Sequence, residues 1–223
     1  MEDLEVKVKG IRKYVNVESI RPALKELERA AIWGYTLTGD YLSGHKVTIV
    51  LQTRGKKATC QGWFLQNGWA TREGDDVHEI TITSETLYKD PVEIVATVIH
   101  EIAHLANHEM GTKDVSKGGR HNKAFKETAE SFGLEVLKPT DSRGFAYTKP
   151  SPALVTKIEK DFVPDVPAFS LFKTLLEPKP KQPSKTVAYQ CSEGCPRIRA
   201  AAGKPVNAEC NACGEHFTLV DSH

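Results

Sequence analysis

The sequence predicts a main domain of the α+β class followed by a small cysteine-rich module. Short β-prone runs lie in the first half of the chain, and stretches with helical periodicity precede and follow them. Seven of the 12 prolines cluster near residues 150 to 183, and four of the five cysteines lie beyond that cluster. These shifts in composition divide the chain into a main domain over 1–150, a Pro- and Lys-rich linker over 151–186 in which 153–161 could form a short helix, and a module over 187–223.

The first part of the main domain alternates between strand and helix signals. Apolar residues alternate with charged ones over 4–8, which predicts a short strand. Apolar residues at helical spacing predict an amphipathic helix over 18–33. Three β-prone runs separated by turn-forming residues then predict a small sheet, with strands over 46–51, 59–65 and 77–83.

The next predicted helix has clear end signals. Asp90 is a favourable N-cap, Pro91 suits the first helical position, and Glu93 completes an Asp-x-x-Glu capping box. Apolar residues then occupy nearly every face of the helix, which indicates that it is buried. Gly111 is expected to end it, and a further helix is predicted over 122–132.

This buried helix contains the sequence His100-Glu101-Ile102-Ala103-His104. Histidines four residues apart lie on one helix face with Cβ atoms about 5–6 Å apart, so both imidazoles can bind one Zn²⁺ at about 2.0–2.1 Å. Glu101 would lie beside the ion and take a proton from a bound water, whose pKa zinc lowers to about 7. Ionisable groups on an apolar helix cost several kcal/mol unless they are paired or coordinated, which favours a metal site over inert polar residues.

A catalytic zinc needs a third protein ligand. His108 lies eight residues beyond His100, which places it about 12 Å further along the helix axis. We therefore expect His108 to be a helix-end residue near the C-terminal dipole. The remaining candidates for the third ligand are His121, Glu127 and Glu130.

The motif and the segment His121-Asn-Lys-Ala-Phe125-Lys126 together resemble the SprT-like, or Spartan-type, zinc metallopeptidase domain. In that family HExxH is followed by a third histidine in an H-G-x-x-F-K context. The resemblance covers roughly 18–150, and the chain departs from the pattern at Asn122, where the family usually has glycine.

The resemblance implies a zincin-like fold and a zinc metallopeptidase with a protein substrate. It implies His100, His104 and His121 as the ligands of a catalytic zinc, with Glu101 as the general base. The chain is also similar to ImmA/IrrE-like peptidases, whose helix can read HEIAH. That similarity implies a downstream glutamate as the third ligand and a specific regulator as the substrate.

Other residues of the main domain are expected to have simpler roles. The strand over 77–83 is expected to pair with the backbone of an extended substrate. His78 is expected to be a surface or satisfied strand residue, and the aromatic residues Trp63, Phe64 and Trp69 are expected to belong to the sheet core.

Four cysteines in the last third of the chain have the spacing of a zinc ribbon: Cys191-x3-Cys195 and Cys210-x2-Cys213. Four thiolates leave no open coordination position, so this zinc is expected to be structural. About 35 residues cannot build a sufficient hydrophobic core, so the metal is expected to hold the module together.

Three basic residues lie between the cysteine pairs, Arg197, Arg199 and Lys204, and Tyr189 and Phe217 flank them. Cations beside exposed aromatic rings can contact phosphates and stack on bases. SprT-like proteins often carry such a C-terminal module, and in Spartan relatives DNA contact directs proteolysis to DNA-bound proteins, so the resemblance implies DNA as a partner. The competing interpretation is a non-catalytic nucleic-acid or protein adaptor in which both metals are structural.

The composition limits the other classes of function. The chain has 30 Lys and Arg against 29 Asp and Glu, so any nucleic-acid contact must come from a local patch. No apolar run approaches the roughly 18 residues that a membrane span needs. The first residues lack a secretory signal and the number of cysteines is odd, so we expect a cytoplasmic protein without a membrane partner.

Overall fold

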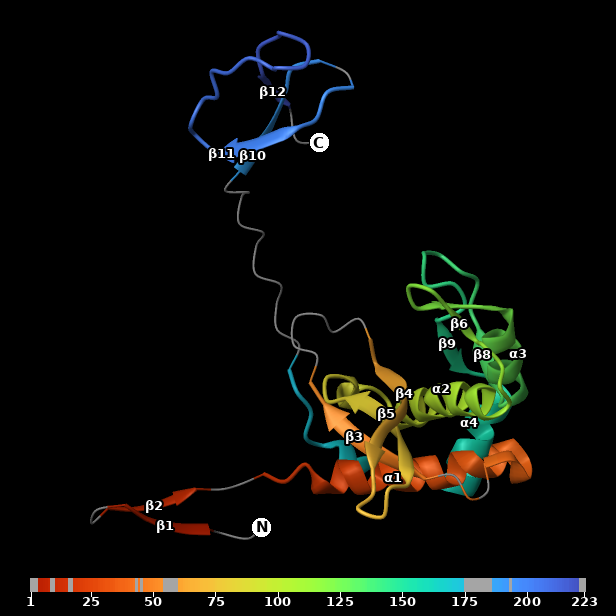
Figure 1. The fold of residues 1–223 in the computed structure, drawn as a ribbon. Helices are drawn as coiled ribbons and strands as arrows, with labels where there is room; N and C mark the ends of the chain where they lie inside the picture. The colour runs from red at the N-terminus through yellow and green to blue at the C-terminus, as the bar shows by residue number, and fades with distance from the viewer. Residues whose placement is uncertain are drawn as a thin grey trace. The chain divides into compact units, whose positions relative to one another are not determined.

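The computed structural model describes residues 4–8, 11–15, 18–42, 44, 46–53, 60–174, 186–192 and 194–220 (Figure 1). The chain forms two units, Met1–Glu177 and Pro178–His223. The first unit mixes helices with small sheets and the second is built around a three-stranded sheet, which confirms the prediction of an α+β protein with a small second unit.

A three-stranded sheet lies at the centre of the first unit. It contains β3 (Val47–Gln52), β4 (Gly62–Ala70) and β5 (Asp76–Thr83) in the order β3-β5-β4. β3 is parallel to β5 and β4 is antiparallel to it, so β5 has a neighbour on each side. The expectation that strand 77–83 pairs with a substrate is therefore wrong, because its backbone groups are already used within the sheet. Residue 59 of the predicted strand 59–65 lies outside the described residues.

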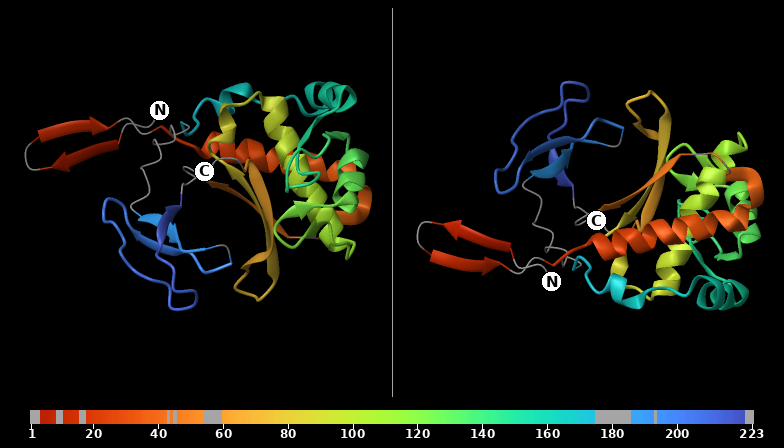
Figure 2. Two further views of the ribbon diagram at one scale, coloured as in Figure 1. Left: turned by 90° about the horizontal axis from the view of Figure 1, so that it is seen from above. Right: turned by 90° about the horizontal axis from the view of Figure 1, so that it is seen from below.

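Two long helices cover one face of this sheet (Figures 1 and 2). These are α1 (Arg21–Tyr35) and α2 (Pro91–Glu109), which follow the two predicted helices within a few residues. Ile80 and Ile82 alternate along β5 and are fully buried in the same core as both helices. At the crossing of the helices, a Cβ on Gly34 would lie 2.5 Å from Ile102 Cδ1, so the absence of a side chain permits their close approach.

α2 is buried on nearly all sides, as its apolar sequence predicts. Asp90 caps it by accepting a hydrogen bond from the Val92 N–H at 2.9 Å. Glu93 pairs instead with Lys89 at 3.3 Å. Gly111 follows the helix with φ of +66°, which suits a glycine at a helix end.

The opposite face of the sheet carries a buried carboxylate. Glu79 of β5 is 6% exposed and accepts a hydrogen bond from Trp69 Nε1 at 2.6 Å. Trp69 itself is 52% exposed, so its predicted place in the sheet core is wrong. Its ring covers a polar group rather than filling the space between helix and sheet.

Smaller elements complete the first unit. An N-terminal hairpin joins β1 (Leu4–Val8), the strand predicted over 4–8, to β2 (Ile11–Val15). The remaining elements of this unit are the 3-10 helices η1 (Thr36–Leu42) and η3 (Thr86–Tyr88), the strands β6 (Val115–Ser116), β7 (Arg120–His121), β8 (Leu134–Val136) and β9 (Thr148–Pro150), and the helix α3 (Lys123–Ser131).

The first unit extends past residue 150, where the linker was expected to begin. α4 (Pro152–Lys157) continues into a π-helical turn, η4 (Ile158–Phe162), and a 3-10 turn, η5 (Val166–Phe169), follows. Phe162 is buried, its ring lies 5.5 Å from that of Trp33, and the Arg29 guanidinium stacks over it at 3.8 Å. Pro152 and Pro167 therefore lie at helix starts rather than in an extended chain. Residues 175–185 of the expected linker lie outside the described residues.

The second unit contains β10 (Thr186–Gln190), β11 (Ile198–Ala201) and β12 (Thr218–Val220). β10 is the central strand and pairs antiparallel with both neighbours. The four cysteines of this unit all lie between the end of β10 and the start of β12 in the sequence.

Truncating a fully buried residue of α2 should destabilise the first unit strongly. Ile99 has no exposed surface, whereas Ile32 on α1 is 68% exposed. We expect Ile99→Ala to lower the free energy of unfolding by about 2–5 kcal/mol, because it removes apolar burial and leaves a cavity. Ile32→Ala, the matched control, should change it by less than about 0.5 kcal/mol. Denaturant unfolding measures both, and equal effects would contradict the assigned core.

Candidate metal centre

Three histidines come together between α2 and β7. His100 and His104 lie one turn apart on α2, with ring centroids 5.2 Å apart. The ring of His121 on β7 lies 5.4 Å from that of His100 and 4.8 Å from that of His104. One ring nitrogen from each lies within 4.8 Å of the others, so this is a candidate metal-binding group. These are the three histidines that the resemblance implies as ligands.

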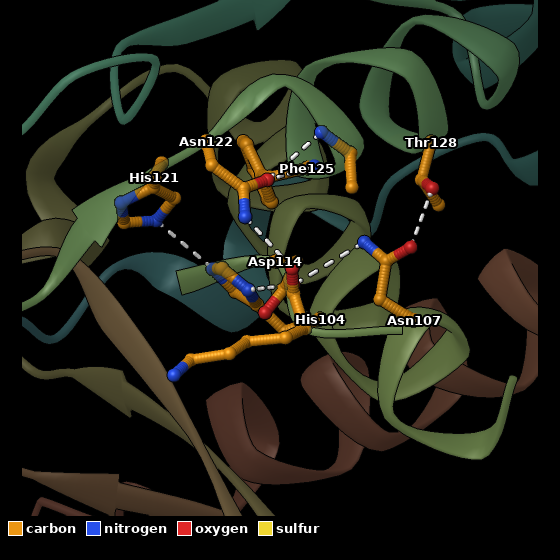
Figure 3. A network of polar contacts seen from close by, with 9 residues as sticks. His104, Asn107, Asp114, His121, Asn122, Phe125 and Thr128 are labelled. Atoms are coloured by element: carbon orange, nitrogen blue, oxygen red, sulfur yellow. Dashed lines mark hydrogen bonds and ion pairs between the residues drawn. The ribbon is translucent and has the colours of Figure 1, made fainter. Parts of the chain in front are cut away.

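Two ring nitrogens of this group, from His104 and His121, face each other closely enough to share one metal ion. His104 Nε2 lies 3.0 Å from His121 Nε2, and the two rings face each other across this gap (Figure 3). At that distance His121 can donate a hydrogen bond to His104 in one tautomer, and in the other tautomer both lone pairs can bind one cation. The Nδ1 atom of His121 is buried and has no hydrogen-bond partner among the described residues. The donor set therefore fits a zinc ion.

An aromatic ring forms the floor of the group. Phe125 of α3 is fully buried, and its ring centroid lies 4.5–4.6 Å from those of all three histidines. Such an apolar floor excludes water from one side of the imidazoles and limits their orientations.

The outward-facing nitrogens of the two helical histidines have polar partners. His100 Nδ1 lies 2.9 Å from Thr148 Oγ1 on β9, and His104 Nδ1 lies 2.6 Å from Asp114 Oδ2. The carboxylate can only accept, so His104 carries a proton on Nδ1 and directs the Nε2 lone pair inward. A carboxylate in this position orients the ring.

Asp114 is itself fixed by a chain of polar contacts (Figure 3). Asn107 Nδ2 donates to Asp114 Oδ2 at 3.2 Å, and Thr128 Oγ1 donates to Asn107 Oδ1 at 2.7 Å. These contacts connect α2, the loop after it and α3. Sequence reasoning missed Asp114, Asn107, Thr128 and Thr148, because they share no motif and meet the histidines only in the folded chain.

Asn122 stands where the SprT-like pattern usually has glycine, and its side chain has structural roles here. Its Oδ1 accepts hydrogen bonds from the N–H groups of Ala124 and Phe125 at 2.8 and 3.2 Å, which caps α3. Its Nδ2 donates to the carbonyl of Lys113 at 2.7 Å, and its backbone N–H donates to the Asp114 carbonyl at 2.9 Å. The asparagine thus holds the loop that carries Asp114 against the start of α3.

Burial keeps the imidazoles of His100 and His121 neutral. Burial, followed by the neighbouring charges of His104 and His121, holds the pKa of His100 well below its ordinary value. Burial is also the main cause that lowers the pKa of His121 to about 4. Because a metal binds the neutral ring, these shifts leave both side chains ready to coordinate at pH 7.

Glu101 lies next to the histidine group and is 4% exposed. Burial raises the pKa of its carboxyl to about 7, and the backbone N–H of Phe64 on β4 partly offsets this by donating to it. A Cβ on Gly62 would lie 2.9 Å from Glu101 Oε1 and 2.8 Å from the Thr81 carbonyl. Because Gly62 has no side chain, the Glu101 carboxylate can lie close to the backbone of β4.

A cleft of about 1100 Å³ opens onto these groups. β4 lines one side of it through Trp63 and Phe64, and the segment 146–150 lines another. Because β4 pairs only with β5 within the described sheet, its other edge faces the cleft.

The glutamates considered as alternative ligands lie elsewhere. The side chains of Glu127 and Glu130 are 63% and 45% exposed, and they pair with Lys123 and Lys126 at 3.3 and 3.7 Å. Both belong to one-turn ion pairs on α3 rather than to the histidine group. His108 is also outside this group.

The four cysteines of the second unit form a separate candidate site. The sulfur atoms of Cys191, Cys195, Cys210 and Cys213 all lie within 4.8 Å of one another. Hydrogen bonds from the backbone N–H groups of Ala212 and Cys213 lower the pKa of Cys210 to about 7. These bonds favour the thiolate form that zinc binds, so the cluster is compatible with a zinc ribbon.

The basic residues near this cluster are exposed, as expected, but one of the aromatic rings that flank them is not. Arg197, Arg199 and Lys204 are all exposed, and the first two donate to Gln190 Oε1 and Thr186 Oγ1 at 3.0 and 3.1 Å. Tyr189 is only 9% exposed and its hydroxyl donates to the Lys204 carbonyl at 3.4 Å. The expected exposed ring at Tyr189 is therefore wrong, because β10 turns it into the small core of this unit.

No family model matches the chain, and neither a curated protein nor a solved structure is detectably similar to it. Among the described residues, no helix combines the length and apolar character needed to cross a membrane.

Removing the charge of Asp114 should weaken metal binding by the histidine group. We expect Asp114→Asn to lower zinc affinity there by about 10–100-fold, because the carboxylate no longer orients the His104 ring. Asp141→Asn, which changes an exposed acid paired with Arg143, is the matched control and should leave affinity unchanged. Competition with a zinc chelator measures the affinities, and an unaltered value in Asp114→Asn would remove this role.

The metal-free protein should lose stability as the pH falls. The pKa of His121 is about 4 in the folded chain against an ordinary value of 6.5, so the unfolded chain binds more protons between these values. Its contribution to stability is therefore full above pH 6.5 and declines as the pH falls toward 4. After chelation, the melting temperature of wild type should fall more steeply over this range than that of His121→Asn. His216→Asn, an exposed control in the second unit, should follow the wild type.

Proposed function

We propose that this protein is a zinc-dependent metallopeptidase of the SprT-like type. The observation that carries the proposal is a group of three histidines, His104 buried and the other two half-buried, with a buried glutamate beside them, in a cleft next to a strand edge. Three protein ligands are the number that leaves a catalytic zinc one position for water or substrate.

When bound by His100, His104 and His121, zinc supplies Lewis-acid chemistry that polarises a peptide carbonyl and makes a water acidic near neutral pH. Glu101 then acts as the general base. A nearby cation lowers the pKa of a carboxyl, so Glu101 in the loaded protein is ionised and can accept a proton from the attacking water. The protonated Glu101 next donates that proton to the amine of the leaving group.

The edge of β4 would orient the substrate. A peptide in extended conformation can pair with the free edge of a sheet through backbone hydrogen bonds. The N–H of Phe64 already donates to Glu101, so a peptide along β4 would lie close to the general base. This assigns to β4 the role that the sequence suggested for strand 77–83.

The second unit would hold its fold through a structural zinc on the four cysteines. Contact with DNA through Arg197, Arg199 and Lys204 is a proposal that rests on their charge and exposure alone. The ImmA/IrrE-like alternative, with a glutamate as third ligand, has less support because Glu127 and Glu130 pair with lysines on the exposed face of α3.

Replacing the general base should abolish peptide hydrolysis without removing the metal. We expect Glu101→Gln to retain its zinc content and to cleave casein at least about 100-fold more slowly, because the amide cannot accept the proton. Glu93→Gln, a glutamate that lines the same cleft and pairs with Lys89, is the matched control and should stay active. Self-cleavage with and without DNA provides a second readout.

Equal rates for the wild type and Glu101→Gln in both assays would contradict the peptidase proposal. They would favour the adaptor alternative, in which both metals are structural.

A further inference from the structure

A second group of possible metal ligands in the first unit lies at the C-terminal end of α2. It consists of His78 on β5 and the adjacent residues His108 and Glu109 on α2. One ligand atom from each lies within 4.8 Å of the others, the same separation that defines the other two groups. The sequence predicts a surface or satisfied strand residue at His78 and a helix-end residue at His108, because the meeting of β5 with the end of α2 is set only by the fold.

The side chains of this group, the His78 group, are close and largely removed from solvent. His78 Nε2 lies 2.8 Å from Glu109 Oε1, and His108 Nε2 lies 4.0 Å from the same oxygen. The side chains of His78, Glu109 and His108 are 10%, 17% and 31% exposed. Ligand atoms around a tetrahedral zinc lie about 3.3 Å apart, given bonds of about 2.0–2.1 Å. His108, the most exposed of the three, would have to approach Glu109 Oε1 more closely to reach that separation.

The group is separate from the histidine group of the cleft. His108 lies one turn beyond His104, and the 12 Å between the levels of His100 and His108 follows from about 1.5 Å per residue. Its ring packs against His78 at 5.3 Å and against Phe64 at 5.8 Å. Phe64 also contacts the His78 ring at 5.6 Å, so one aromatic residue shields both imidazoles.

The surroundings favour a cation. The group lies at the last turn of α2, where the helix dipole attracts positive charge. It opens into a cavity of about 450 Å³ whose lining includes the acidic residues Asp75 and Asp76. Lys46 also lines the cavity, but it pairs with Asp75. Glu109 and Asp76 add two further acids to the cavity lining.

Metal binding requires a change in the hydrogen bonding of the His78 ring. The Asn67 N–H donates to His78 Nδ1 at 3.2 Å, so in the metal-free protein the neutral ring carries its proton on Nε2 and donates to Glu109. A metal on Nε2 would shift that proton to Nδ1, and the hydrogen bond from the Asn67 N–H would then have to break. Asn67 lies at the irregularity of the β4–β5 pairing, with φ of +47°, and borders the cavity, so its backbone has room to adjust.

We propose that His78, His108 and Glu109 form a third zinc site, distinct from the catalytic site and from the ribbon. Two imidazoles and a carboxylate are a ligand set that binds zinc, with a water from the cavity in the fourth position. The ion joins β5 to the last turn of α2 and so clamps the helix that carries His100, Glu101 and His104 onto the sheet.

The zinc content of the full chain tests this proposal. Protein dialysed to equilibrium against micromolar free zinc should contain three zinc ions per chain by elemental analysis. His78→Gln and His108→Gln should each contain two, because each removes one imidazole of the His78 group. His216→Gln, an exposed histidine outside all three groups, is the matched control and should contain three.

Further variants and a stability measurement assign the ions. His104→Ala should also contain two ions, and the double variant His104→Ala/His108→Gln should contain one. In the wild type, zinc beyond two equivalents should raise the melting temperature, and in His108→Gln it should not. Two ions in the wild type would overturn the proposal, and so would three ions retained in both His78→Gln and His108→Gln. Neither result depends on whether the protein cleaves peptides.

Discussion

Burial of α2 between the sheet and its neighbouring helices is the constraint on which the candidate site depends. The helix is apolar on nearly all faces, and its polar residues His104, Glu101 and Asn107 are as inaccessible as the isoleucines around them. A buried polar group destabilises a protein unless it has partners. The fold therefore has to provide partners for each of these groups, and the structure around α2 does so.

The partners come from every side of the helix. Asp114 receives the His104 ring and the Asn107 amide, Thr148 meets His100, and the Phe64 N–H reaches Glu101. These contacts orient the imidazoles with their Nε2 atoms free for a metal. Two of the three histidines thus lie on a packed helix rather than on loops, and a rigid support keeps ligands at bonding distance.

Different features stabilise the two units. The first buries a large apolar core, including fully buried isoleucines on β5 and α2. The second has few buried residues, among them Tyr189 and Cys210, and brings four sulfur atoms together instead. A small unit with so little apolar burial gains its stability from metal binding or comparable cross-links.

The sequence by itself determined the local features of this protein. The Asp90 cap, the apolar pattern of α2, the four-residue spacing of His100 and His104 and the cysteine spacing all depend on neighbours along the chain, so they could be predicted without a structure. The boundary near residue 150 was wrong because Phe162 packs against Trp33, a contact between distant residues that composition does not reveal.

Only the tertiary structure decided which residues support those local features. The position of β5 between two strands, the contact of Asp114 with His104 and the meeting of His78 with His108 and Glu109 all join segments that share no motif. Spacing along a helix is set by its 3.6-residue repeat, whereas contacts between elements are set by how the whole chain packs. For that reason the ligands on one helix were predictable, and their partners on other elements were not.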